Sequence, residues 1–80
     1  MSDSFPLPEL KVGGKAIVAK IETQDEGLIR HLMAMGVIQG VNILLESRFP
    51  SYVVQVGKSR AALDKETAQI IYVTQEENSE

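Results

Sequence analysis

Residues 28–40 read Leu-Ile-Arg-His-Leu-Met-Ala-Met-Gly-Val-Ile-Gln-Gly. Within this stretch Leu28, Leu32 and Met35 are four and three residues apart, which is the spacing of one apolar face of an α-helix. Gly36 follows at once, and glycine commonly ends helices in the left-handed conformation. The stretch holds no nucleophile beside a base, no phosphate-binding loop and no pair of metal ligands. It therefore favours a protein that binds a partner over one that catalyses a reaction.

We expect this helix over about residues 24–35. Thr23 and Glu26 match the capping-box pattern that opens many helices, and Asp25 is an equally good N-cap. Gly27 lies in the first turn, where it costs up to about 1 kcal/mol relative to alanine. Packing against the rest of the protein must therefore hold the helix in place.

The segments around the helix are typical of short strands. Residues 15–21 alternate along a β-branched pattern, and the other candidate strands are residues 41–48, 52–56, 60–63 and 69–74. We expect the structural turns at three glycines, Gly36, Gly40 and Gly57. Asp64 can cap one further helical turn over residues 64–68. About five strands with one inserted helix predict a mainly-β fold, a small SH3-like barrel, in which closing the sheet protects its edges.

Eighty residues are enough for one domain. We expect a flexible N-terminal arm at residues 1–6, because Pro6 and Pro8 exclude a regular helix or a central strand there. The barrel domain then occupies residues 7–74, and residues 75–80 form a disordered acidic tail.

The net charge of −3 comes from the C-terminus. Three of the eleven acidic residues, Glu76, Glu77 and Glu80, follow the last candidate strand, which leaves eight acidic against eight basic residues in the body. Proteins that bind nucleic acids usually carry a strongly basic face, so we expect no nucleic-acid partner. The absence of cysteine excludes disulfides, thiolate zinc sites and iron–sulfur clusters.

The N-terminal residues lack the basic and apolar regions of a signal peptide. No run approaches the roughly 18 apolar residues that a membrane-spanning helix needs. We therefore expect a cytoplasmic protein without direct membrane insertion, located at the inner membrane only through a protein partner.

Three features resemble reactive sites without meeting their requirements. His31 is the only histidine and has no acidic residue four positions before it, so an exposed surface histidine is the simpler interpretation. Met33 and Met35 suit cuprous copper, but core packing for Met35 and an adaptable contact for Met33 explain them better. Residues 12–16 lack the first glycine and the final hydroxyl of a phosphate loop. We therefore expect no catalytic residue, cofactor or metal ligand.

Three basic residues, Arg48, Lys58 and Arg60, fall near the ends of neighbouring strands. They could form a small basic patch for phosphate or an acidic partner. Ordinary surface, in which they pair with Glu46 and Asp64, is the competing interpretation.

The order and spacing of these motifs resemble the FeoA family of small proteins from bacterial ferrous-iron uptake. The matching pieces are Leu7-Pro-Glu-Leu10 with Gly13, Ala16-Ile-Val18 with Ile21, the stretch from Arg30 to Gly40, and Gly57, Ala61-Ala-Leu63, Ala68 and Ile71-Tyr-Val73. Two features depart from the family pattern. Asp64 stands where the family often has Arg, and the loop at residues 49–51 is shorter than in many members.

The resemblance implies an SH3-like barrel that is not an enzyme and that docks on FeoB, the membrane permease with a cytosolic GTPase domain. The same domain type also ends metal-dependent repressors, so a regulatory or nucleic-acid-binding module is the alternative. Transition-metal binding is associated with the family as a whole and is assigned to no residue here. Weak self-association is a further expectation.

The partner interface should use exposed residues, since an apolar side chain beside an arginine is typical of contact hot spots. The helix stripe of Leu28, Leu32 and Met35 is expected to fill the barrel, which leaves the helix flank and nearby loops for the partner. The predicted interface residues are Arg30, Met33, Phe49, Tyr52 and Arg60.

Overall fold

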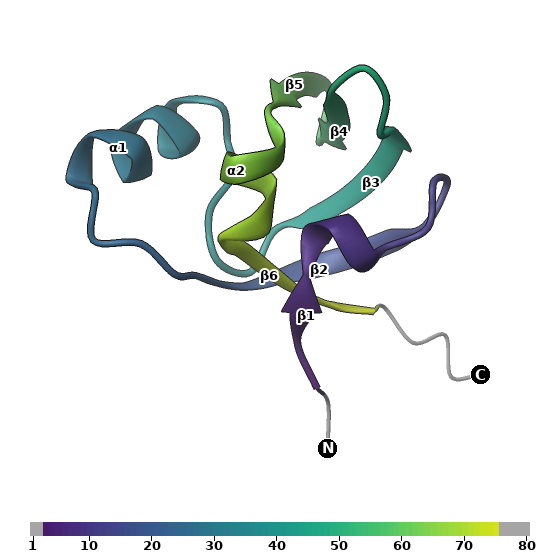
Figure 1. Ribbon diagram of the computed structural model, residues 1–80, viewed down its shortest axis with the longest axis horizontal. Coiled ribbons are helices and arrows are strands. Elements are labelled where there is room, and N and C mark those ends of the chain that lie inside the picture. Colours follow the sequence, from purple (N-terminus) through teal and green to yellow (C-terminus); the bar gives the residue numbers. More distant parts are fainter. Residues whose placement is uncertain (1–2, 76–80) are drawn as a thin grey trace.

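The computed structural model describes residues 3–75, so most of the expected acidic tail lies outside the described residues. Six antiparallel strands form one sheet in the order β1-β6-β2-β3-β4-β5. The sheet is strongly curved, and α1 stands beside it at one end of the long axis (Figure 1). The strands are β1 (Phe5–Pro6), β2 (Lys15–Ile21), β3 (Asn42–Ser47), β4 (Tyr52–Val56), β5 (Ser59–Leu63) and β6 (Ile71–Gln75). The mainly-β prediction is confirmed.

The structure has one strand more than expected. Phe5 and Pro6 form β1, in which Phe5 pairs with Val73 and Pro6 with Tyr72 of β6. Proline lacks the N–H that a central strand must donate, but an edge strand tolerates it. Part of the segment expected as a flexible arm is therefore a sheet edge, and the fold begins at residue 5.

The core is built from alternate residues of the strands. Ala16 and Val18 of β2 are buried while their neighbours are partly exposed, as a half-buried strand requires. The register shifts after Val18 and again after Leu45, and such bulges increase the local bend of a sheet. The remaining buried apolar side chains on the strands are Ile43, Leu45, Val54, Ala61, Leu63, Ile71 and Val73.

Two short helices fill the gap between the outer strands β1 and β5. They are the 3₁₀-helix η1 (Leu7–Glu9) and α2 (Lys65–Gln69), which contact each other and carry the buried residues Leu7 and Ala68. Asp64 caps α2, and its side chain accepts a hydrogen bond from the backbone N–H of Thr67. The predicted helical turn near residues 64–68 is confirmed, and its role is to close the seam of the barrel.

The long helix α1 (Glu26–Ala34) begins two residues later than expected. Asp25 is the N-cap, because its Oδ1 accepts from the N–H of Leu28 at 3.1 Å. The Thr23 hydroxyl instead accepts from the N–H of Asp25, so the capping-box interpretation that starts at Thr23 is wrong. An Asx cap two residues downstream leaves room for only nine helical residues.

A Schellman motif ends α1. The N–H of Gly36 donates to the carbonyl of Met33 at 2.9 Å, and the N–H of Val37 donates to the carbonyl of Leu32 at 2.8 Å. The motif needs a left-handed residue, and Gly36 has a φ of 88°. Gly40 and Gly57 also have positive φ values, in the turns that lead into β3 and β5.

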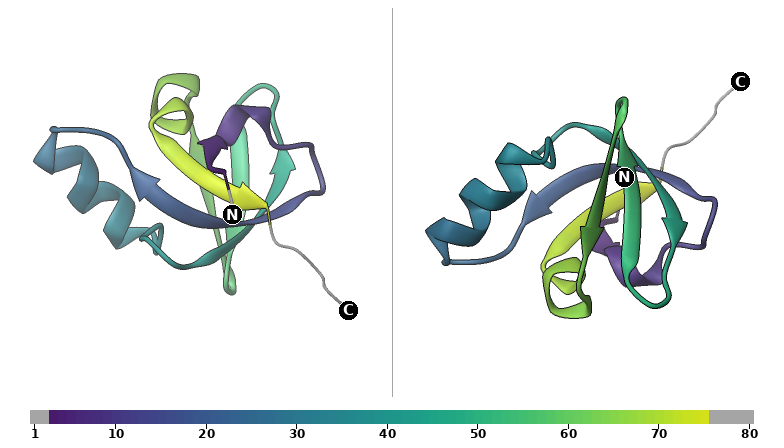
Figure 2. Two further views of the ribbon diagram at one scale, coloured as in Figure 1. Left: turned by 90° about the horizontal axis from the view of Figure 1, so that it is seen from below. Right: turned by 90° about the horizontal axis from the view of Figure 1, so that it is seen from above.

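The apolar stripe of α1 contributes only one fully buried residue. Leu32 is buried, whereas Leu28 and Met35 are partly exposed and pack against the edge of the core. The two views in Figure 2 show why, because α1 lies beyond one end of the sheet rather than inside the barrel. The flank of α1 is therefore free for other contacts.

Candidate partner-binding surfaces

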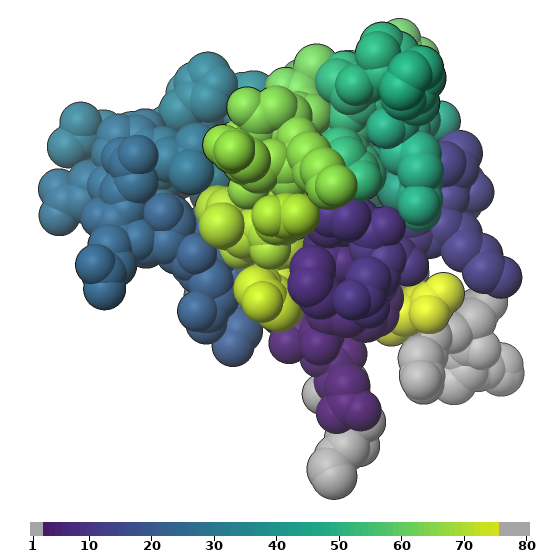
Figure 3. All heavy atoms as spheres, in the orientation of Figure 1, coloured from purple at the N-terminus to yellow at the C-terminus, as the bar shows by residue number. Residues whose placement is uncertain are grey.

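An apolar groove lies between α1 and the chain segments that connect it to the sheet. Ile29 and Met33 are one helical turn apart, and they face Ile21 at the end of β2 and Ile38 with Gln39 after the helix. These five residues, which we call the α1 groove, line a hollow of about 410 Å³. Met33 is 55% exposed and Ile38 is 42% exposed. The spheres of α1 form a lobe that stands off from the barrel (Figure 3).

Arg30 and His31, which the sequence places on the polar flank of α1, are both exposed there. Arg30 lies one turn after Glu26, and its Nη2 is 3.9 Å from the Glu26 Oε1. Both side chains are largely exposed, so the pair contributes little to stability. Arg30 and Met33 are thus available on neighbouring parts of α1.

The loop between β3 and β4 and the turn before β2 lie away from α1, toward the other side of the molecule (Figure 1). Phe49, in the loop between β3 and β4, is 85% exposed, and Val12, in the turn before β2, is 52% exposed. The Arg48 guanidinium donates to the carbonyl of Leu10, which ties this loop to the segment that carries Val12.

Tyr52 is less exposed than the sequence suggested, whereas Arg60 is exposed and forms a surface ion pair. Tyr52 is half-buried on β4 opposite Leu63 and packs against the core. The Nε of Arg60 lies 3.0 Å from the Oε1 of Glu46. The five predicted interface residues therefore belong to separate regions. Arg30 and Met33 lie on α1, Phe49 lies in the loop between β3 and β4, Tyr52 is half-buried on β4, and Arg60 is exposed on β5.

The structure does not gather Arg48, Lys58 and Arg60 into the basic patch that the sequence left as an alternative. Arg48 precedes β4 and Lys58 follows it, so the two lie at opposite ends of this strand. Arg48 and Arg60 are in addition held by Leu10 and Glu46. The competing interpretation of ordinary surface is correct for Arg60, which pairs with Glu46 as expected.

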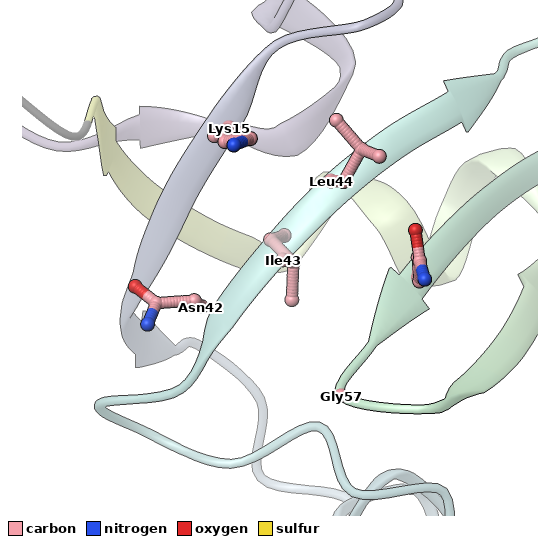
Figure 4. Close-up of a pocket in the computed structure, with 6 residues that line it drawn as sticks. Lys15, Asn42, Ile43, Leu44 and Gly57 are labelled. Atoms are coloured by element: carbon pink, nitrogen blue, oxygen red, sulfur yellow. The ribbon is translucent and has the colours of Figure 1, made fainter.

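The sequence analysis did not predict a hollow on the outer face of the sheet, which polar and apolar side chains line in similar measure. Lys15 of β2 pairs with Leu44 of β3, and Leu44 pairs with Gln55 of β4. With Asn42, these side chains line a hollow of about 310 Å³ (Figure 4). Only the cross-strand register brings them together, and no local motif carries that information.

The described residues offer little for metal or acid–base chemistry. Within residues 3–75 no three His, Cys, Asp or Glu side chains come close enough to hold a metal ion. Asp64 is the one described group whose pKa is clearly shifted, and it caps α2. Over the same residues, no helix has the length and apolar character needed to cross a membrane.

The sequence model of the FeoA domain matches residues 5–75. The chain belongs to the FeoA family. This family is associated with ferrous iron transport, and the match begins at β1 and ends with β6. No curated protein sequence matches the chain.

Solved structures agree with the family assignment. A FeoA described as an iron uptake regulatory protein is 28% identical, with a TM-score of 0.79 over 89% of this chain and 95% of that one. The zinc complex of FeoA from Stenotrophomonas maltophilia is 25% identical, with a TM-score of 0.74 over 99% of both chains. That FeoA is described as a prokaryotic SH3 domain protein and a candidate activating factor for ferrous iron transport. The SH3-like prediction is confirmed.

The fold also occurs in a manganese-dependent transcriptional repressor, which is 20% identical, with a TM-score of 0.84 over 91% of this chain and 41% of that one. IdeR of T. acidophilum is 22% identical, with a TM-score of 0.86 over 91% of this chain and 34% of that one. Identities at this level show the shared fold alone, and the match covers about a third of the IdeR chain.

Proposed function

We propose that this FeoA-family protein is a non-enzymatic cytosolic accessory factor of ferrous-iron uptake. It docks on the cytosolic GTPase region of a FeoB-type permease, and this contact brings it to the inner membrane. The observation that carries the proposal is the family match over nearly the whole described chain. The description of a related FeoA as a candidate transport activating factor points to a protein partner as well.

The α1 side of the molecule is the surface that we assign to this partner. Met33 and Ile38 are exposed apolar residues beside Arg30, and arginine next to apolar side chains is enriched in contact hot spots. Because α1 lies outside the barrel, a partner can cover its flank without disturbing the core. Phe49, Tyr52 and Arg60 lie in the loop between β3 and β4, on β4 and on β5, so we do not assign them to this face.

Calorimetric titration of the permease's cytosolic GTPase domain into this protein tests the proposal. The domain is used without nucleotide, with GDP and with a non-hydrolysable GTP analogue. We expect binding in at least one state, and at least tenfold weaker binding for Met33→Glu. Ala62→Glu is the matched control, since Ala62 is an exposed apolar residue on β5. Absence of binding at tens of micromolar in all three states would contradict the proposal.

A regulatory or nucleic-acid-binding module is the second candidate, favoured by the fold shared with the manganese-dependent transcriptional repressor. The separated positions of Arg48 and Lys58 weigh against it. Titration with mixed single-stranded oligonucleotides at low salt decides the matter, because binding through phosphates weakens steeply as salt is added. We expect no salt-dependent binding.

A further inference from the structure

Residues 23–39, which we call the α1 lobe, leave the barrel and return to it at nearly the same place (Figure 2). Before the lobe, the N–H of Glu22 donates to the carbonyl of Ile70 at 2.8 Å. After it, the N–H of Gly40 donates to the carbonyl of Val18, also at 2.8 Å. Val18 lies on β2 and Ile70 immediately precedes β6, and these two strands pair with each other. The lobe is therefore anchored at both ends to one stretch of the sheet, as a hinged element is.

Between these anchors the polar interactions of the α1 lobe are local. Asp25 caps the helix, Arg30 pairs with Glu26, and the N–H groups that follow the helix bond to its last carbonyls. Among the described residues, no hydrogen bond or ion pair joins residues 23–39 to the strands. Packing of side chains therefore holds the lobe against the barrel.

Two side chains provide most of this packing. Leu32 of α1 and Val37 after it are the fully buried residues of the lobe, whereas Leu28 and Met35 are partly exposed. The other twelve of the fourteen buried apolar residues come from the rest of the described chain. The strand pairs also use no residue of the lobe. The barrel therefore keeps its strand pairing and most of its core when the lobe moves away.

The helix in the lobe depends on being docked. It has nine residues, whereas isolated helices shorter than about 12–15 residues are marginal in water. Gly27 in its first turn weakens it further. Segments with few buried apolar contacts open at a lower free energy than the rest of a protein. A lobe that leaves the barrel should therefore also lose its helical hydrogen bonds.

We propose that the α1 lobe detaches reversibly from the barrel as one unit while the barrel stays folded. The hinges are residues 22–24 on the entry side and Gly40 on the exit side. Gly40 has a φ of 95°, and the position of a Cβ there has no atom within 4 Å, so the chain has room to turn. The inference rests on the fold alone and does not depend on the proposed function.

Detachment takes the α1 groove apart. Ile21 belongs to β2 and stays with the barrel, whereas the other four lining residues, Ile29, Met33, Ile38 and Gln39, move with the lobe. The groove is therefore present only in the closed state. A molecule that binds there favours closure, because a ligand shifts the equilibrium toward the state to which it binds better.

Hydrogen exchange of the intact protein, followed for each residue by NMR, tests the proposal. We expect the amides of residues 30–37 to have protection factors at least about tenfold lower than those of the paired residues of β2 and β6. In urea below the unfolding midpoint, the lobe amides should share one dependence on urea. This dependence should be weaker than that of the strand amides, because partial opening exposes less surface.

Two results of this experiment would overturn the proposal. Equal protection and equal urea dependence in the lobe and the strands would show that the protein opens only as a whole. Lobe amides that each respond differently to urea would show fraying of single residues instead of detachment of one unit.

Substitutions separate the two parts. Val54 of β4 is fully buried and stays packed when the lobe opens, so Val54→Ala should lower the protection of the strand amides and leave that of the lobe amides unchanged. Leu32→Ala removes the main anchor and should lower the protection of the lobe amides at least about tenfold. His31→Ala, at the exposed neighbouring position, is the matched control and should not lower it.

The same variants can contradict the proposal. If Val54→Ala lowers the protection of lobe and strands by one common factor, the lobe opens only when the barrel unfolds. If Leu32→Ala leaves the lobe amides as protected as His31→Ala does, Leu32 does not anchor the lobe. The urea series on the wild-type protein decides the question even for a variant that fails to fold.

Discussion

The Oδ1 of Asp64 accepts a hydrogen bond from the backbone N–H of Thr67 at 2.8 Å, and this contact starts the helix that closes the barrel. Asp64→Ala removes the cap and should lower the melting temperature by several degrees. Asp64→Asn should keep most of the stability, because asparagine is an equally good N-cap. Thermal denaturation at pH 7 compares the two variants, and equal losses would show that the carboxylate charge, not the cap, is what matters.

The same carboxylate makes stability depend on pH. Hydrogen bonding by the Thr67 side chain, and next by its backbone N–H, lowers the pKa of Asp64 from its ordinary value of 3.8. The unfolded chain therefore binds a proton at higher pH than the folded one, and the contribution of Asp64 is present above about pH 3.8 and lost as the pH falls through the folded pKa. Asp64→Asn should show a smaller loss of stability between pH 5 and pH 2 in acid titrations followed by circular dichroism.

Gly36 should resist substitution for a conformational reason. Its φ of 88° costs a residue with a Cβ atom about 1–2 kcal/mol, while an added Cβ would meet nothing closer than the Val56 Cγ1 at 3.5 Å. We expect Gly36→Ala to lower the free energy of unfolding in urea by this amount. Gly27→Ala is the matched control in the first turn of α1 and should stabilise by about 0.5–1 kcal/mol. Equal effects of the two substitutions would contradict the Schellman assignment.

The local sequence pattern was enough to predict the strands in which buried and exposed residues alternate clearly, and the glycines at which α1 ends and turns. The predicted bounds of β2 and β4 are those of the structure, and Asp64 caps a helix as expected. Local pattern failed at Phe5 and Pro6, because the pairing partners of β1 lie nearly seventy residues away in β6. It also misplaced the start of α1, because Thr23 and Asp25 are both suitable N-cap residues and only the structure shows that Asp25 is the cap.

The candidate surfaces were harder to predict than the fold. Exposure of Met33 and Phe49 follows from their positions off the apolar stripe and in a turn. The sequence does not predict that Met33 and Phe49 lie apart, because their separation depends on where the curved sheet places α1 relative to the loop between β3 and β4. Arg48 and Lys58 are only ten residues apart in the sequence, but the five-residue strand β4 lies between them and keeps them at opposite ends.

The seam between β1 and β5 gives a test of the closure mechanism. Leu7 of η1 is fully buried against the core and lies beside α2. Leu7→Ala should cost about 2–5 kcal/mol, a large part of the stability of so small a domain. Phe5→Ala, at a half-buried site on β1, should cost less. Urea denaturation measures both, and a cost for Leu7→Ala below that of Phe5→Ala would show that η1 is not part of the core.

The ion pair between Arg60 and Glu46 should matter little for stability, although its Nε–Oε1 distance is only 3.0 Å. The Arg60 side chain is 71% exposed, and exposed pairs contribute about 0.2–1 kcal/mol because solvent screens them and both side chains lose freedom. A double-mutant cycle with Arg60→Ala and Glu46→Ala should give a coupling energy in this range. Salt at about 1 M shortens the screening length to about 3 Å and should nearly abolish the coupling. A coupling above about 2 kcal/mol that salt does not weaken would instead show that the bulge at Glu46 depends on this arginine.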